Sequence, residues 1–270
     1  MRIPPLLHHV HLPTFDHLLE RASGPEATFH LEWALSCQKA YPDFLHLYWD
    51  YEAARKLVEM HYPAFLPVWQ DLPWDMHKAD AIRYLIMHRF GGVYMDADVA
   101  CYRPAQDMLA GYDVGTADPE YLASAVLASA PGHPLWTHVV ELLEKRYHGF
   151  TGQERAGHVL DLTGPFMLRD ALKEYLFGSD AEEFNGRVSG GVHEAPIPAA
   201  GSGQPHSLIR IHELGTFFTP CFWYDEQCHK RMARMQRLGT VPVHLAGYHL
   251  YRGSWWGNTG NAASSDGIAE

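Results

Sequence analysis

The sequence predicts an α/β fold, built as one large domain around a mostly parallel central sheet. Over the first hundred residues, short apolar runs of strand length alternate with helical segments, a pattern typical of parallel sheets. The chain has 270 residues, of which 47% are hydrophobic and 20% charged, so it can bury a sizeable core. We expect this domain to span 1–256, with 257–270 as a disordered tail.

The N-terminal part supplies the first strands and helices of this alternation. Residues 4–12 are an apolar run of strand length. Residues 25–39 follow a Ser-Gly-Pro start and place two aromatic residues one turn apart, which indicates a helix. The aromatic run 44–49 predicts the second strand, and 51–61 predicts a helix that ends before Pro63.

The next segment contains the clearest helix, which spans 77–90 and is ended by Gly91 and Gly92. A strand over 93–99 follows it directly. The same criteria give the remaining elements: strands at 112–117 and 123–129, helices at 134–147 and 165–177, loops at 66–75 and 185–206, and a loop-rich C-terminal part.

Charge and cysteine content exclude several classes of protein. With 21 basic and 32 acidic residues the net charge is −11, which excludes the broad basic surface of a nucleic-acid-binding protein. The four cysteines form no Cys-x-x-Cys pair and are too sparse for a disulfide scaffold, so we expect a reducing, cytoplasmic environment. We also expect no signal peptide and no membrane span, because no apolar stretch approaches ~18–20 residues.

Two carboxylates close to each other are the first candidate for chemistry. Side chains alternate between the faces of a strand, so Tyr94, Asp96 and Asp98 are expected to share one face of the strand over 93–99. Such a pair suits a hard divalent cation, which offsets the repulsion between the carboxylates. A solvent-facing strand edge explains the same spacing, and Asp-x-Asp alone is common by chance.

The preceding helix adds a second polar pair. Asp80 and Arg83 are three positions apart and can pair directly, either as an ordinary surface ion pair or as a hydroxyl-binding carboxylate beside a phosphate-binding guanidinium. The Gly-Gly joint brings this pair close to the carboxylate strand. The expected core stripe of the helix is Ala79, Ile82, Ile86 and Phe90, and the adjoining face is Asp80, Arg83, Tyr84 and Met87.

The string KADAIRYLIMHRFGGVYMDADV, residues 78–99, resembles the core of the DXD-containing sugar-binding region of glycosyltransferases. That family includes fungal α-mannosyltransferases, glycolipid glycosyltransferases and large bacterial glucosylating toxins. Its signature joins an Ala-Asp-x-x-Arg-Tyr helix to Gly-Gly-x-Tyr-x-Asp-x-Asp. All of these positions are matched, by Ala79, Asp80, Arg83, Tyr84, Gly91, Gly92, Tyr94, Asp96 and Asp98.

Weaker resemblances extend along the chain. The opening IPPLLHHVHL is similar to the first strand of the family, with His8 at the family His and His11 where the family has Trp. YPDFLHLYWD resembles the second strand, and LTGP at 162–165 resembles a motif near the acceptor side. The segment HLYRGSWW, 249–256, resembles the closing His-rich Ser-Trp segment of the family.

The resemblance implies a GT-A fold, a single Rossmann-like domain with added helices. It implies transfer of a hexose from a UDP- or GDP-linked sugar to a glycan, lipid or protein acceptor, with retention and with Mn²⁺ or Mg²⁺. It also implies three catalytic residues, which are Asp80, Arg83 and Asp96, and three metal ligands, which are Asp98, Asp96 and His249, with His244 as the competitor of His249. The implied donor-binding residues are His8, Val10, His11, Asp80, Arg83, Tyr94, Asp96, Ala97, Asp98, Ser254 and Trp255.

Two other functions compete with this interpretation. A non-catalytic nucleotide-sugar-binding protein could keep the same scaffold, although the intact set of carboxylates and arginine argues against it. A metal-dependent phosphohydrolase could use the same carboxylates, but the sequence has no second acidic cluster for a two-metal site and no nucleophile motif. Neither a nucleic-acid partner nor a membrane-spanning segment is expected.

Overall fold

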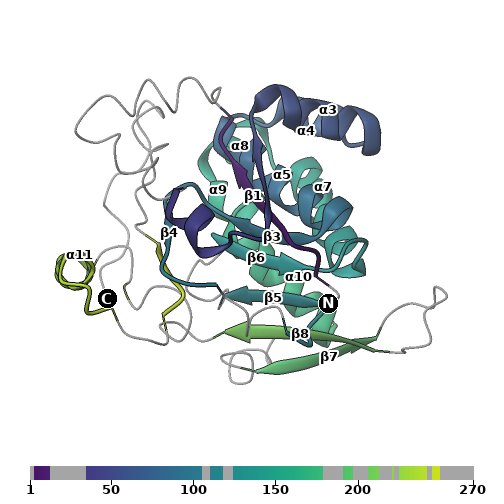
Figure 1. The fold of residues 1–270 in the computed structure, drawn as a ribbon. Helices are drawn as coiled ribbons and strands as arrows, with labels where there is room; N and C mark the ends of the chain where they lie inside the picture. The colour runs from purple at the N-terminus through teal and green to yellow at the C-terminus, as the bar shows by residue number, and fades with distance from the viewer. Residues whose placement is uncertain are drawn as a thin grey trace.

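A seven-stranded sheet forms the centre of this computed structural model, and helices cover one face of it (Figure 1). The structure describes residues 3–12, 35–104, 110–117, 124–178, 191–196, 206–212, 221, 225–241 and 245–249. The order of the strands across the sheet is β2-β1-β3-β6-β5-β8-β7. A second, two-stranded sheet pairs β4 with β9.

Five of the seven strands of the central sheet run in the same direction. The pairs β1 with β2, β1 with β3 and β5 with β8 are parallel, whereas β6 is antiparallel to both of its neighbours and β7 is antiparallel to β8. The predicted α/β class and mostly parallel sheet are therefore confirmed. The strands are Leu6–Val10 (β1), Leu45–Trp49 (β2), Gly92–Met95 (β3), Val99–Cys101 (β4), Val114–Ala117 (β5), Val126–Ser129 (β6), Val192–Pro196 (β7), His206–His212 (β8) and Gly247–His249 (β9).

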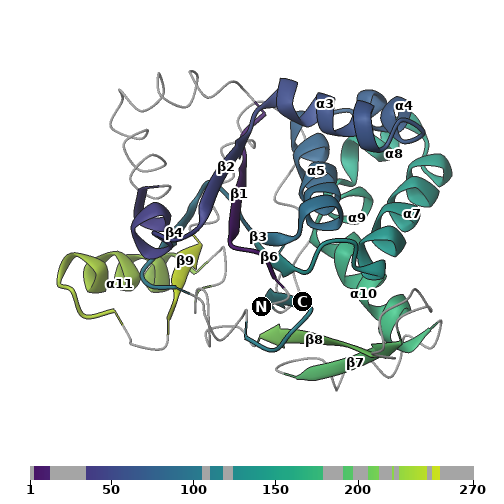
Figure 2. The same ribbon diagram turned by 45° about the vertical axis from the view of Figure 1, so that its right-hand side comes forward.

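The helices of the chain lie mainly on one side of the sheet, as both ribbon views show (Figure 2). Among the described residues, no helix has the length and apolar character that crossing a membrane requires. The helices are Tyr51–His61 (α3), Leu66–Asp71 (α4), Asp75–Phe90 (α5), Pro134–Gly149 (α7), Gly152–Gly157 (α8), Val159–Leu162 (α9), Pro165–Phe177 (α10) and Glu226–Arg237 (α11).

The sheet separates two hydrophobic cores. The larger core packs α5, α7 and α10 against the sheet and contains Trp69 and Trp136, both fully buried. The smaller core lies on the other face, where Tyr41 and Met95 pack with the start of the chain and β4. Both faces of the central sheet are therefore covered near β1 and β3, as expected for an α/β domain.

Helix α5 is buried around its whole circumference, which differs from the predicted one-sided core stripe. Every residue from 79 to 87 is buried, whereas Phe90, assigned to the core stripe, is only partly buried. The helix packs against the sheet and also against α7 and α9, so its polar residues Asp80 and Arg83 lie inside the protein. The prediction of a helix that Gly91 ends is confirmed, since Gly91 is its C-cap.

The strand predicted over 93–99 is interrupted. Strand β3 ends at Met95, residues 96–98 form a turn in which the Val99 amide donates to the Asp96 carbonyl at 3.1 Å, and β4 begins at Val99. A continuous strand would place the two Asp side chains on one face but about 7 Å apart along the chain. The turn instead brings both carboxylates toward one point, and it redirects β4 into pairing with β9.

Several elements lie where loops were predicted. Helix α4 begins with Pro67 in its first turn, a position where the missing amide hydrogen costs nothing. Helix α11 is capped by Asp225, whose carboxylate accepts from the Cys228 amide at 2.9 Å. Strand β7 exists because β8 offers it an antiparallel partner, a contact that its Gly- and Pro-rich surroundings do not signal. Of the predicted helix over 25–39, only 35–40 is described, and it is helical; the predicted tail 257–270 lies outside the described residues.

The four cysteines form two disulfides, which the sequence reasoning, with its expectation of a reducing environment, did not predict. Cys37 is joined to Cys101 at the end of β4, and Cys221 is joined to Cys228 in α11. The first pair is 64 residues apart and the second only 7, so spacing alone did not reveal the pairing. The cysteine argument for a reducing compartment therefore fails, while cytoplasmic localisation itself stays a prediction from the sequence.

We expect Gly91→Ala to destabilise the fold more than Gly178→Ala. Both glycines end a helix at positive φ, +62° and +69°, so alanine is strained at either site. Only at Gly91 would the new Cβ lie 2.5 Å from the Ser129 carbonyl oxygen; at Gly178 it meets nothing within 4 Å. The extra loss at Gly91 should be about 2 kcal/mol in the free energy of unfolding, measured by urea denaturation. Equal losses in the two variants would contradict the close approach.

Candidate active site

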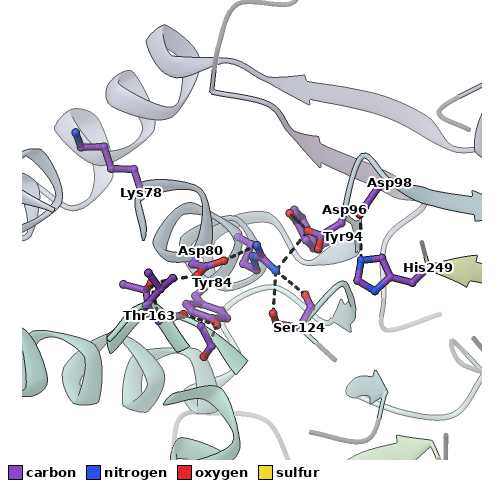
Figure 3. Close-up of polar contacts among 12 residues, drawn as sticks. Lys78, Asp80, Tyr84, Tyr94, Asp96, Asp98, Ser124, Thr163 and His249 are labelled. Atoms are coloured by element: carbon purple, nitrogen blue, oxygen red, sulfur yellow. Dashed lines mark hydrogen bonds and ion pairs between the residues drawn. The ribbon is translucent and has the colours of Figure 1, made fainter. Parts of the chain in front are cut away.

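Polar side chains from α5, β3, the turn after β3, β9 and two loops lie near the ends of β1, β2 and β3 (Figure 3). These strands are parallel, and their register places His8 beside Leu47 and Tyr94. Two residues further along each strand, the chain reaches the same edge of the sheet, where Asp96 follows β3. In open α/β sheets, ligands bind at the carboxyl ends of the strands, so Asp96 lies where a ligand is expected.

Asp96, Asp98 and His249 form a compact cluster at this edge. One ligand atom from each residue lies within 4.8 Å of the other two, and all three side chains are partly buried. The His249 Nε2 atom is 3.2 Å from Asp98 Oδ1. The sequence-based ligand set is therefore brought together, while the competing residue His244 lies outside the described residues.

The antiparallel ladder of β4 and β9 brings His249 to the carboxylates. In this ladder Val99, the residue after Asp98, lies opposite His249. Behind it, Ala100 and Tyr248 pack in a small hydrophobic cluster with α11. Formation of this ladder therefore determines whether the imidazole can reach Asp98.

A buried guanidinium joins the helix α5 to the carboxylate turn. Arg83 donates to Asp80 Oδ1 at 2.5 Å, and its Nη1 atom is 3.3 Å from Asp96 Oδ1. The same Nη1 atom donates to the Ser124 carbonyl at 3.0 Å and to the Ser124 hydroxyl at 2.9 Å. Only 8% of the Arg83 side chain and 7% of the Asp80 side chain are exposed, which excludes the surface ion pair.

Asp80 has one oxygen on Arg83 and the other on Thr163. The Thr163 hydroxyl donates to Asp80 Oδ2 at 3.1 Å, so the LTGP segment reaches back to α5. Burial raises the pKa of Asp80 to about 6, against the opposing effect of Arg83. Burial thus makes the Asp80 carboxylate easier to protonate than an exposed Asp, while the salt bridge with Arg83 favours its charged form.

Two tyrosines complete the surroundings of this network. Tyr94 donates to Asp96 Oδ1 at 2.5 Å, and its ring centroid lies 5.0 Å from the Arg83 guanidinium carbon. Tyr84 donates to the Thr163 carbonyl at 2.8 Å. Burial raises the pKa of both tyrosines well above the ordinary value, so they act as hydrogen-bond donors. Tyr94 thus orients a carboxylate and packs at the same time.

The predicted donor-binding residues on β1 have different surroundings. His8 is fully buried: its Nε2 donates to the Gly91 carbonyl at 3.0 Å, and its Nδ1 accepts from Trp49 at 3.1 Å. Burial lowers the pKa of His8 to about 4, so it is neutral and joins β1 to its neighbours. Val10 lies in the larger core, and the His11 amide donates to the Trp49 carbonyl.

The remaining predicted residues divide into two groups. Ala97 lies in the turn between the two carboxylates and is partly exposed. Ser254 and Trp255 lie outside the described residues.

Sequence reasoning missed Ser124, which accepts two hydrogen bonds from Arg83, because no motif surrounds it and its loop comes to Arg83 only through the fold.

The donor set at the cluster fits a divalent cation. Two carboxylates and one imidazole are ligands that Mn²⁺ accepts, and the atoms are close enough to share one ion. Burial alone would lower the pKa of His249, but Asp98 and then Asp96 outweigh it and raise that pKa above 6.5. A cation between these groups would take over the role of the proton, since a metal ligand must be a neutral imidazole.

A comparison with known families matches the part of the chain that contains Asp80, Arg83, Asp96 and Asp98. Residues 31–114 match the family described as the glycosyltransferase sugar-binding region containing the DXD motif. Over this part, which is less than half of the chain, the sequence is similar to that region. Its DXD motif is Asp96, Ala97 and Asp98, which lie in the turn between β3 and β4.

Several curated relatives of this chain are fungal enzymes. An inositol phosphoceramide mannosyltransferase of Schizosaccharomyces pombe is 35% identical over 112 residues, which are 41% of this chain and 32% of the relative. A mannosyl phosphorylinositol ceramide synthase of Saccharomyces cerevisiae is 30% identical over 140 residues, 52% of this chain and 36% of the relative. The matched part of the chain therefore spans about a third of the length of these relatives.

A solved structure is similar in fold over about two thirds of the chain. The glycosyltransferase PaToxG matches with a TM-score of 0.50 and 16% identity, over 68% of this chain and 73% of its own. At this identity the likeness concerns the fold, and it agrees with the predicted glycosyltransferase fold. The recognition of the DXD family from residues 78–99 is confirmed.

Removing one ligand of the DXD cluster should weaken Mn²⁺ binding. We expect Asp98→Asn and His249→Ala each to lower the Mn²⁺ affinity more than about 10-fold, because each removes a donor atom from the cluster. Titration followed by electron paramagnetic resonance measures free Mn²⁺ directly. Asp75→Asn and His148→Ala change exposed residues of the same types and should leave the affinity unchanged. Equal losses in the control variants would contradict the assignment.

The Mn²⁺ affinity should also depend on pH with a definite sign. The raised pKa of His249 means that protons compete with the metal, so the affinity should fall about tenfold per pH unit below that pKa. Above that pKa the imidazole is neutral, so the Mn²⁺ affinity no longer changes with pH through His249. The same titration at pH 5.5 to 8 measures the slope. In His249→Ala this contribution to the slope should disappear; an unchanged slope would mean that His249 is not a ligand.

Proposed function

We propose that the chain is a metal-dependent glycosyltransferase that transfers a hexose from a UDP- or GDP-linked sugar to a glycan, lipid or protein acceptor. The observation that carries this proposal is the contact of two sets of residues at one sheet edge. The buried Asp80–Arg83 pair reaches Asp96 directly, and Asp96 belongs to the cluster with Asp98 and His249. One continuous polar site thus contains a cation-binding cluster beside hydrogen-bonding groups.

Each part of this site has a chemical role in sugar transfer. Asp96, Asp98 and His249 would hold Mn²⁺ or Mg²⁺, which when bound supplies positive charge for a diphosphate leaving group. Asp80, whose charged form is favoured by the pair with Arg83, would accept hydrogen bonds from sugar hydroxyls. Arg83 fixes both Asp80 and Asp96 in place and adds positive charge within an acidic protein.

The names of the relatives favour mannose as the transferred hexose. Two groups of them are named mannosyltransferases or mannosyl phosphorylinositol ceramide synthases, and a third is named for initiation-specific α-1,6 mannosyl transfer. We therefore propose a mannosyl donor first, with a phosphate-bearing lipid as the first acceptor class to test. Retention at the anomeric carbon is part of the proposal and rests on the family resemblance.

A non-catalytic nucleotide-sugar-binding protein is the second candidate. Its supporting observation is that Arg83 already uses its terminal nitrogens on Asp80, Asp96 and Ser124, so the network also has a structural role. We favour catalysis, because the three acidic residues Asp80, Asp96 and Asp98 are all present. A protein that only binds nucleotide-sugars would not need all three.

The test is turnover with a panel of donors. The protein is incubated with Mn²⁺ and GDP-mannose, UDP-glucose or UDP-galactose, and release of GDP or UDP is measured with and without an inositol-phosphate acceptor. We expect release with one donor and a product that contains the sugar. Asp98→Asn should lower kcat by about 100-fold or more, because it removes charge stabilisation at the leaving group. Arg83→Ala should lower kcat and raise the donor KM.

The matched control is Asp75→Asn, an exposed carboxylate in the first turn of α5, which should keep wild-type rates. Donor binding without any turnover would establish the non-catalytic function instead. Hydrolysis of simple phosphate esters, with no preference for nucleotide-sugars, would establish the phosphohydrolase.

A further inference from the structure

Helix α11 carries a basic face on an otherwise acidic protein. Between Glu226 and Arg237 it has four basic residues and one acidic residue, a net charge of +3, while the rest of the chain carries −14. At about 100° per residue, the basic side chains fall within roughly a third of the circumference of the helix. They are Lys230, Arg231, Arg234 and Arg237, and all four are exposed.

Among the described residues, only one of these four basic side chains has an acidic partner. Lys230 pairs with Glu226 at 2.7 Å on the same helix. Within the described part of the chain, no carboxylate lies within ion-pair distance of Arg231, Arg234 or Arg237. Just beyond the helix, Leu238 is 62% exposed, so the basic face ends in an apolar side chain.

The opposite face of α11 packs against β4 and β9, the two strands next to the metal-binding cluster. Met232 is buried in a cluster with Tyr248 and Ala100, and a hydrogen bond joins the His229 Nδ1 atom to the Tyr248 hydroxyl. Tyr248 directly precedes the cluster residue His249 on β9. Both ribbon views place α11 at the edge of the fold, beside β4 and β9 and away from α5, α7 and α10 (Figures 1 and 2).

We propose that this face of α11, formed by Arg231, Arg234, Arg237 and Leu238, docks the protein on a membrane surface that contains anionic lipids. Charge complementarity identifies the partner, since each Arg near such a surface attracts it and the attraction falls off within a Debye length. An exposed Leu beside the arginines can enter the interface between headgroups and acyl chains. A rod of nucleic acid fits less well, because beyond this short helix it would meet a protein surface of net negative charge.

Docking through α11 would keep the candidate active site at the lipid surface. The β4–β9 ladder lies between α11 and the cluster of Asp98 and His249. This proposal adds a membrane interaction to the proposed function. It is tested by vesicle binding alone, so its result does not depend on whether the protein transfers a sugar.

The experiment is co-sedimentation of the full chain with vesicles of phosphatidylcholine alone and of phosphatidylcholine with 30% phosphatidylserine. We expect binding only to the vesicles that contain phosphatidylserine, weakened as salt is raised from 0.05 to 0.5 M. The variant Arg231→Gln/Arg234→Gln/Arg237→Gln should bind roughly 100-fold more weakly, since three residues each contribute about fivefold.

The matched control removes three exposed basic residues from other helices, Lys56→Gln/Arg89→Gln/Lys145→Gln, and should bind like the wild type. Circular dichroism establishes that both triple variants are folded, and the salt dependence of the wild type tests the charge independently of any variant. Equal binding to both vesicle types, no binding to either, or equal losses in the two variants would overturn the proposal.

Discussion

The burial of one positive charge between two negative charges is the constraint on which the site depends. The Arg83 guanidinium lies inside the protein, and taking any ion out of water costs several kcal/mol unless partners compensate for it. Asp80, Asp96 and the oxygens of Ser124 compensate here. Loss of Arg83 would leave two carboxylates with mutual repulsion, so the guanidinium stabilises the fold and the site together.

This constraint requires that helix, turn and strand meet at fixed distances. Gly91 and Gly92 allow α5 to lead directly into β3, because a side chain at either position would meet neighbouring backbone or side-chain atoms. Thr163 reaches Asp80 from the opposite direction. The short joint therefore decides where Arg83 lies relative to Asp96, and the packing around α5 prevents either from moving into solvent.

The other half of the site depends on contacts between distant segments. His249 reaches Asp98 only because β9 pairs with β4, and β4 is tied by a disulfide between Cys101 and Cys37. A second disulfide joins α11, the helix behind this ladder, to Cys221. Among the described strands, the pair β4–β9 brings the imidazole of His249 to the DXD motif, and a disulfide lies on each side of this pair. The geometry of the cluster therefore depends on contacts between segments that are far apart in the chain.

The sequence by itself determined the helix α5, its glycine end, the DXD motif and the family, because these depend on residues close together in the chain. Spacing placed Asp80 and Arg83 on one face of a helix, but only the tertiary structure showed that the pair is buried and reaches Asp96. The turn at 96–98, the pairing of β7, the helix α11 and both disulfides depend on contacts between segments that local periodicity does not record. Ser124 belongs to the site for the same reason: its partner Arg83 lies 41 residues away, and the fold alone brings them together.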